Sequence, residues 1–152
     1  MMSHPYAHPY RILIMPPARD VDQHGSGAFG ASRGWRPHRG IDIACYAGSI
    51  VCAIRAGVVT KIGYPYDPTK TGNSRKAHFR YVQVTDDQGN DVRYFYLESL
   101  VKTGDVIEPG QPIGNSQKLS AVYPGITDHI HFEVKKDGKH IDPTNILSGI
   151  DR

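Results

Sequence analysis

The stretch His129-Ile130-His131-Phe132-Glu133-Val134 has the composition of a β-strand and carries two histidines at alternate positions. Successive side chains of a strand point to opposite faces, so both imidazoles lie on one face, roughly 6–7 Å apart along the strand. Neutral imidazole is a common zinc ligand near pH 7. The stretch therefore predicts both a sheet and a pair of potential metal ligands on one of its faces.

Similar short segments recur along the chain. Glycine (16) and proline (11) punctuate the apolar stretches, and no window shows sustained helical periodicity. The turn Asp86–Asn90 separates two of the expected strands as a hairpin. The expected strands are Ile41–Ala44, Ile50–Ile54, Gly57–Ile62, Phe79–Val84, Val92–Leu97 and Ile130–Val134. The sequence thus predicts an all-β fold built from antiparallel hairpins.

Two segments, Tyr64–Ala77 and Asn115–Asp128, have the composition of long loops. Long loops in a compact β domain tend to flank a functional site. Residues 1–26 are predicted to form an N-terminal arm, and residues 27–152 a single domain.

Length and charge exclude several classes of protein. With 152 residues, 39% hydrophobic and 22% charged, the chain is expected to be an ordinary globular protein with one core. Its apolar runs are too short to cross a bilayer. The formal net charge is only +3, and Lys135-Lys136 is the densest basic pair, so we expect no nucleic-acid partner and no membrane partner. We expect a monomer.

The chain has two cysteines, Cys45 and Cys52. A hairpin around Tyr46–Ser49 would bring them close enough for a disulfide, but two cysteines do not make a disulfide framework. Two buried free thiols are favoured over the bridge.

A second cluster of potential ligands is His38-Arg39-Gly40-Ile41-Asp42. A loop that runs into a strand would bring His38 and Asp42 together. Two histidine nitrogens and one aspartate oxygen would leave a fourth tetrahedral position for water, which is typical of a catalytic zinc site. Each motif alone is weak, because H-x-H and H-x-x-x-D are both common by chance.

The order of the flanking motifs is more specific, and it covers the chain from about Gly27 to Leu147. The motifs are Gly27–Arg33, His38–Ala44, Ala56–Val59, Lys102–Gly114, His129–Val134 and Asp142–Leu147. This collinear series resembles the lysostaphin/LytM-type zinc endopeptidases. The resemblance implies twisted antiparallel sheets with loops that wall a groove, and hydrolysis of peptide cross-links in bacterial peptidoglycan. It also implies that His38, Asp42 and His131 bind Zn²⁺ and that His129 is catalytic.

The chain departs from that family at one position. The family has Tyr-x-His-Leu where this chain has Tyr94-Phe95-Tyr96-Leu97, so Tyr96 stands in place of a second catalytic histidine. Tyr123-Pro124-Gly125-Ile126 and Cys45 are similar to the leukocyte cell-derived chemotaxin branch of the fold, whose members are regarded as non-peptidases. The alternative function is therefore a catalytically silent, zinc-bearing binding or signalling module. A lipoyl-type carrier is a weaker third hypothesis, because it would need no convergent metal ligands.

The sequence also predicts the direction of the side chains around Tyr96 and the chemistry of its hydroxyl. Strand parity places Tyr94 and Tyr96 on one face and Phe95 towards the core. With a pKa near 10, Tyr96 is not a base at neutral pH, but it can donate a hydrogen bond to an oxyanion. Other tyrosines are candidates for the groove wall, although packing of their rings is the usual role of tyrosine in β domains; they are Tyr64, Tyr66, Tyr94 and Tyr123.

The sequence also predicts whether three polar residues on or near the expected strands contact the site. Glu133 shares a face with His131, so it is a candidate for hydrogen bonding to this histidine, with a solvated strand edge as the equal alternative. His78 could reach the site, but a solvated position at a loop end is favoured. His140 is expected to be exposed.

No leader segment is visible in the first residues, so the sequence does not specify the localisation. The expected partners are peptidoglycan or its stem and cross-bridge peptides. The site of action is then outside the cytoplasm, in the cell wall, the periplasm or the surrounding medium.

Overall fold

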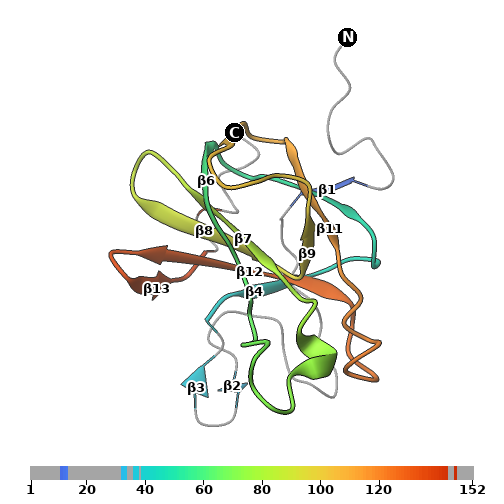
Figure 1. Ribbon diagram of the computed structural model, residues 1–152. Helices are drawn as coiled ribbons and strands as arrows, with labels where there is room; N and C mark the ends of the chain where they lie inside the picture. The colour runs from blue at the N-terminus through green and yellow to red at the C-terminus, as the bar shows by residue number, and fades with distance from the viewer. Residues whose placement is uncertain (1–10, 14–31, 34–35, 38, 144–145, 147–152) are drawn as a thin grey trace.

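The computed structural model describes residues 11–13, 32–33, 36–37, 39–143 and 146. These residues form two main sheets and one short two-stranded sheet (Figure 1). The strands are β1 (Arg11–Leu13), β2 (Ser32–Arg33), β3 (Arg36–Pro37), β4 (Ile41–Ala44), β5 (Ile50–Cys52), β6 (Gly57–Gly63), β7 (Tyr81–Thr85), β8 (Asn90–Phe95), β9 (Leu97–Ser99), β10 (Val106–Ile107), β11 (Pro112–Ser116), β12 (His129–Lys136) and β13 (Lys139–Ile141). A 3₁₀ turn, η2 (Ser74–Lys76), lies in the loop before β7. The all-β class predicted from the sequence is confirmed.

The larger sheet has seven strands in the order β10-β6-β7-β8-β12-β13, with β4 paired to β12 beside this path. All of its pairs are antiparallel. The smaller sheet has the order β1-β5-β11-β9, and its β1–β5 pair is parallel. Residues 11–13 of the predicted arm therefore belong to a sheet. The arm boundary at residue 26 lies outside the described residues and stays a prediction.

The hydrophobic core lies against one face of β12 and of its neighbouring strand β8. Ile130, Phe132 and Val134 on β12 are completely buried, and so is Tyr94 on the adjacent strand β8. Complete burial of such a side chain stabilises the fold by about 1.5–3 kcal/mol. The opposite face of β12 carries His129, which is buried, and His131, which is partly buried. Alternation along one strand thus separates the core from the polar site.

The prediction for Phe95 was wrong. Tyr94 is completely buried in the core, whereas Phe95 is partly exposed and lies on the face of His131, with ring centroids 5.0 Å apart. The alternation continues through β8 and ends at Tyr96, whose φ of 72° is left-handed. Both Tyr96 N and Leu97 N donate to the carbonyl of Arg80, at 2.8 and 3.1 Å. This irregularity turns Tyr96 to the side that Phe95 occupies.

Both cysteines are free, and Cys52 is buried while Cys45 is partly buried. Burial raises the pKa of the Cys45 thiol to about 11. The prediction of two free thiols is confirmed, although only Cys52 is fully buried. No helix among the described residues is long and apolar enough to span a bilayer.

The hairpin β7–β8 turns through Asp86–Asn90, as predicted, around the Asp86 carboxylate. Asp86 Oδ1 accepts from the amides of Gln88 and Asn90, each at 2.9 Å, and Oδ2 lies 3.1 Å from Arg55 Nε. Burial alone would raise the pKa of Asp86, but the hydrogen bonds from Asn90 and Gln88 and the charge of Arg55 outweigh it and lower the pKa. The carboxylate therefore stabilises the fold in its ionised form.

We expect Asp86→Ala to lower the free energy of unfolding by about 2–4 kcal/mol, because it leaves several donors without an acceptor. The exposed neighbour supplies a matched control, and Asp87→Ala should change stability by less than about 0.5 kcal/mol. Because the folded pKa is depressed, the contribution is present above the ordinary pKa of 3.8 and is lost as the pH falls through the lowered value. Urea unfolding at pH 7 and pH 3 measures both effects. An equal loss at both pH values would contradict the role of the charge.

Candidate metal centre and its groove

Asp42 and His131 are brought together by the pairing of β4 with β12. They are direct partners in the register, and their side chains lie on one face, with Asp42 Oδ1 2.8 Å from His131 Nδ1. Asp42 is only 3% exposed. The two atoms thus face one another, from a buried and a partly buried side chain, as two ligands of one ion would.

Gly40 lets β4 approach β12 this closely. A Cβ at this position would overlap the carbonyl oxygen of Phe132 and would come within 2.9 Å of the His131 ring. This steric constraint explains why a glycine lies between the predicted ligands His38 and Asp42. His38 itself lies outside the described residues, so its role stays a prediction.

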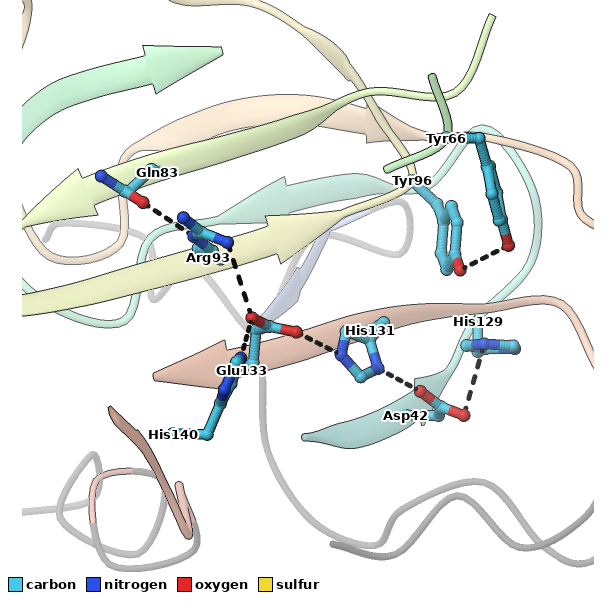
Figure 2. A network of polar contacts seen from close by, with 9 residues as sticks. All are labelled: Asp42, Tyr66, Gln83, Arg93, Tyr96, His129, His131, Glu133 and His140. Carbon is cyan, nitrogen blue, oxygen red and sulfur yellow. Dashed lines mark hydrogen bonds and ion pairs between the residues drawn. The ribbon is translucent and has the colours of Figure 1, made fainter. Parts of the chain in front are cut away.

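His131 lies between two carboxylates, as Figure 2 shows. Its Nε2 is 2.9 Å from Glu133 Oε1, opposite the contact of Nδ1 with Asp42. Burial alone would lower the pKa of His131, but Asp42 and Glu133 outweigh it and raise the pKa to about 9. A neutral ring that keeps its proton on Nε2, towards Glu133, presents the lone pair of Nδ1 at the position that Asp42 faces. The expectation that Glu133 bonds to this histidine is confirmed.

His129 has a defined orientation as well. Its Nδ1 is 2.6 Å from the carbonyl oxygen of Thr127, which can only accept, so Nδ1 carries a proton. In the neutral ring the lone pair is then on Nε2, which lies 3.5 Å from Asp42 Oδ2. The basic nitrogen of His129 is thus directed to the same carboxylate as His131.

Tyr96 joins this group from the end of β8. Its ring is perpendicular to that of His129, with centroids 5.9 Å apart, and its hydroxyl lies 3.4 Å from that of Tyr66 (Figure 2). Burial raises the pKa of Tyr96 to about 12. The phenol therefore stays protonated at neutral pH and can act as a hydrogen-bond donor.

The two predicted loops meet above the site. Tyr123, from the loop before β12, donates a hydrogen bond of 2.9 Å to the Tyr66 hydroxyl, and Arg75 Nη2 donates to the carbonyl of Ala121 at 3.1 Å. Together with the sheet they enclose a groove of about 600 Å³. Its lining includes four of the five predicted site residues, which are Asp42, Tyr96, His129 and His131.

Figure 2 shows Tyr66 and Tyr96 on one side of His131, and Arg93 and His140 on the other. Tyr64, Tyr66 and Tyr123 line the groove as the sequence suggested, whereas Tyr94 is in the core, where its hydroxyl accepts from Ile54 N at 3.1 Å. The lining also includes the basic side chains of Arg39, Arg93, Lys135 and His140, together with Glu133. His78 is exposed at the loop end.

Sequence reasoning missed the roles of Arg93 and His140. His140 was expected to be exposed, but it is only partly exposed and its Nε2 lies 2.7 Å from Glu133 Oε2. Arg93 Nη1 lies 3.8 Å from the same oxygen. The alternation of polar residues along β8 and β12 indicates that Arg93 and Glu133 lie on the polar faces of their strands. It does not specify that the two strands are neighbours, so it could not predict the contact.

The donor set fits a zinc ion. Nitrogen and carboxylate oxygen donors are those that zinc prefers, and the carboxylate on the far side of His131 is a usual accompaniment. Among the side chains of residues 39–143 and Ile146, no group of three His, Cys, Asp or Glu residues is arranged to hold a metal ion. Those residues contain only two of the three predicted ligands, since His38 is not among them.

The fold and the grouping of Asp42, His129 and His131 in one groove define a β-sheet protein with a metallopeptidase-like site. The sequence profile named Peptidase family M23 matches residues 36–143, and the chain belongs to this family. The recognition of the lysostaphin/LytM family from the sequence is thereby confirmed.

Particular relatives fall into two groups. Leukocyte cell-derived chemotaxin-2 of Bos taurus is 32% identical over 115 residues, which cover 76% of this chain and 71% of that protein. The peptidoglycan DD-endopeptidase ShyC of Vibrio cholerae is 28% identical over 112 residues, 73% of this chain and 23% of ShyC. The solved structure of lysostaphin, an antimicrobial peptidase from Staphylococcus simulans, superimposes with a TM-score of 0.61 at 22% identity, covering 85% of this chain and 50% of that one. This last likeness concerns the fold.

We expect Gly40→Ala to separate β4 from β12 and to lower the free energy of unfolding by about 1–3 kcal/mol, because the added methyl group overlaps backbone. NMR should show shifted His131 and Asp42 resonances in this variant. Gly138→Ala is a suitable control, since its φ is 76° but no atom lies within 4 Å of the added methyl group. It should cost about 1 kcal/mol and leave the resonances of the site unchanged. An unperturbed site in Gly40→Ala would contradict the steric role of Gly40.

Proposed function

We propose that this protein is a zinc-dependent endopeptidase that hydrolyses peptide cross-links of bacterial peptidoglycan, outside the cytoplasm. The observation that carries the proposal is the convergence of Asp42 Oδ1, His131 Nδ1 and His129 Nε2 in one groove. His38 is proposed as the third ligand. Membership of family M23 and the similarity to ShyC support a peptidoglycan substrate.

A zinc ion held by His38, Asp42 and His131 would act as a Lewis acid on the scissile carbonyl and would activate water as a nucleophile. The remaining steps fall to protein side chains. Nε2 of His129 takes the proton of the attacking water as the C–O bond forms. The imidazole then gives this proton to the leaving nitrogen as the C–N bond breaks.

Tyr96 would act on the developing oxyanion. Because its pKa is raised to about 12, the hydroxyl keeps its proton and donates it in a hydrogen bond. Its left-handed φ of 72° is strained for a tyrosine, and strain of this kind is concentrated at functional sites. The rings of Tyr66 and Tyr123 and the basic residues of the groove lining would bind the peptide on either side.

A second candidate function is a catalytically silent zinc-bearing module that binds a peptide, a glycan or a receptor. Tyr96 favours it, because this residue replaces the histidine that the lysostaphin-type enzymes use. The identity of 32% with chemotaxin-2 favours it as well. The intact set of Asp42, His129 and His131 favours the enzyme, since a silent module has no use for a basic nitrogen beside the ligands.

The first test separates metal binding from chemistry. We expect one zinc ion per chain, with most of it lost in His38→Ala. His129→Ala should retain zinc but lose hydrolysis of purified peptidoglycan by about 10²–10⁴-fold, because its proton transfer is removed. Elemental analysis, and mass spectrometry of the released fragments after chelation and restoration of zinc, measure the two effects.

Two results would count against this assignment. A full equivalent of zinc in His38→Ala would show that the ligand set is wrong. Loss of zinc in His129→Ala would indicate a closed structural site with four protein ligands, which favours the binding module.

The second test decides the role of Tyr96. We expect Tyr96→Phe to lower turnover by about 10²-fold with zinc content unchanged, because only the donor is removed. Tyr96→His should keep or raise the activity. Tyr46→Phe is the control, since Tyr46 is 91% exposed and does not line the groove.

If the wild-type protein cleaves no type of peptidoglycan and Tyr96→His gains cleavage, the enzyme proposal fails. The protein is then a binding module on a peptidase scaffold.

A further inference from the structure

The Glu133 carboxylate is the centre of a second layer of contacts behind the proposed metal site. Glu133 is only 5% exposed, and both of its oxygens are engaged. Oε1 contacts His131 Nε2 at 2.9 Å, while Oε2 contacts His140 Nε2 at 2.7 Å. An ionised carboxylate can only accept hydrogen bonds, and each of these contacts pairs one of its oxygens with a ring nitrogen. The proton in each contact therefore belongs to the histidine.

The carboxylate is held from both sides of its strand. His140 lies on β13 and Arg93 on β8, and these strands flank β12 in the sheet. Arg93 Nη1 is 3.8 Å from Glu133 Oε2, as Figure 2 shows. A glutamate with three side-chain torsions would lose this orientation without such contacts.

Arg93 is itself fixed by its neighbours. Its Nε donates to Gln83 Oε1 at 2.7 Å, and its guanidinium lies 5.0 Å from the centroid of the Tyr81 ring. Gln83 Nε2 in turn donates to Thr60 Oγ1 at 3.0 Å. The contacts thus run from β13 through β12, β8 and β7 to β6, across five strands of the large sheet.

We propose that His140, assisted by Arg93, is a positioning residue for the metal site: it holds Glu133 where it accepts the Nε2 proton of His131 and so turns Nδ1 towards Asp42. This inference rests on the proposed function, because it assigns a role relative to the metal ligand His131. Contacts of this kind behind a histidine ligand change metal affinity by about 10–100-fold when they are removed.

A purely structural role of the His140–Glu133 contact makes different predictions. The contact could fasten the short strand β13 (Lys139–Ile141) to β12 and do nothing else. Its removal would then lower stability, but it would leave zinc affinity and the His131 ring unaffected. The experiment therefore has to measure the ring and the metal, besides the fold.

Zinc affinity is the first measurement, with zinc alone as the probe in competition with a chelator. We expect His140→Leu to weaken zinc binding by about tenfold or more. His140→Gln should recover most of the affinity, because its amide can donate to Glu133. Lys139→Leu is the control, since Lys139 is exposed in the same strand, and its affinity should equal that of the wild type. In a Glu133→Ala background, His140→Leu should have no further effect, because the effect passes through Glu133.

The second measurement needs no metal. In the chelated protein, the Nε2 proton of His131 should exchange with solvent slowly in the wild type and severalfold faster in His140→Leu, as followed by proton NMR. Unchanged exchange, or equal zinc affinity in His140→Leu and the wild type, would overturn the proposal. A wild type that binds no zinc would refute the proposed function, and the exchange rate would still decide whether His140 orients His131.

Discussion

The contact between Asp42 and His131 is the constraint on which the rest of the site depends. It exists because β4 and β12 pair with these residues opposite one another, at a separation that Gly40 permits. An imidazole between two buried carboxylates is electrostatically favourable as a cation, and it is equally suited to bind a metal once its proton leaves. The core on the other face of β12 keeps this arrangement rigid, because Ile130, Phe132 and Val134 are completely buried.

Tyr96 shows how a local break in regular structure changes the chemistry of a site. A strand that continued past Phe95 would have turned the next side chain into the core. The left-handed residue and the shared Arg80 carbonyl instead direct the phenol to the histidines. The break thus brings a phenol to the groove at the position where the resemblance to the lysostaphin/LytM family implies an imidazole.

The two groups of relatives correspond to two uses of one scaffold. Asp42, His131 and the oriented His129 would serve the proposed hydrolase, whereas a groove lined by tyrosines and basic side chains suits peptide binding with or without cleavage. Under the proposed function, catalysis depends on whether the phenol of Tyr96 can serve where the family resemblance implies a second imidazole. The two proposed functions therefore differ in a single proton donor, because both use the same sheets, the same groove and the same arrangement of Asp42, His129 and His131.

The sequence by itself determined the fold class, the hairpin at Asp86–Asn90, the family, and the grouping of Asp42, His129, His131 and Tyr96. These features depend on strand alternation, turn residues and the order of motifs, which are local or collinear properties. Only the tertiary structure decided that Phe95 faces the groove, that Tyr66 and Tyr123 join two loops, and that Arg93 and His140 hold Glu133. The register between distant strands and a single left-handed torsion create these contacts, and neither is encoded in the spacing of residues along one strand.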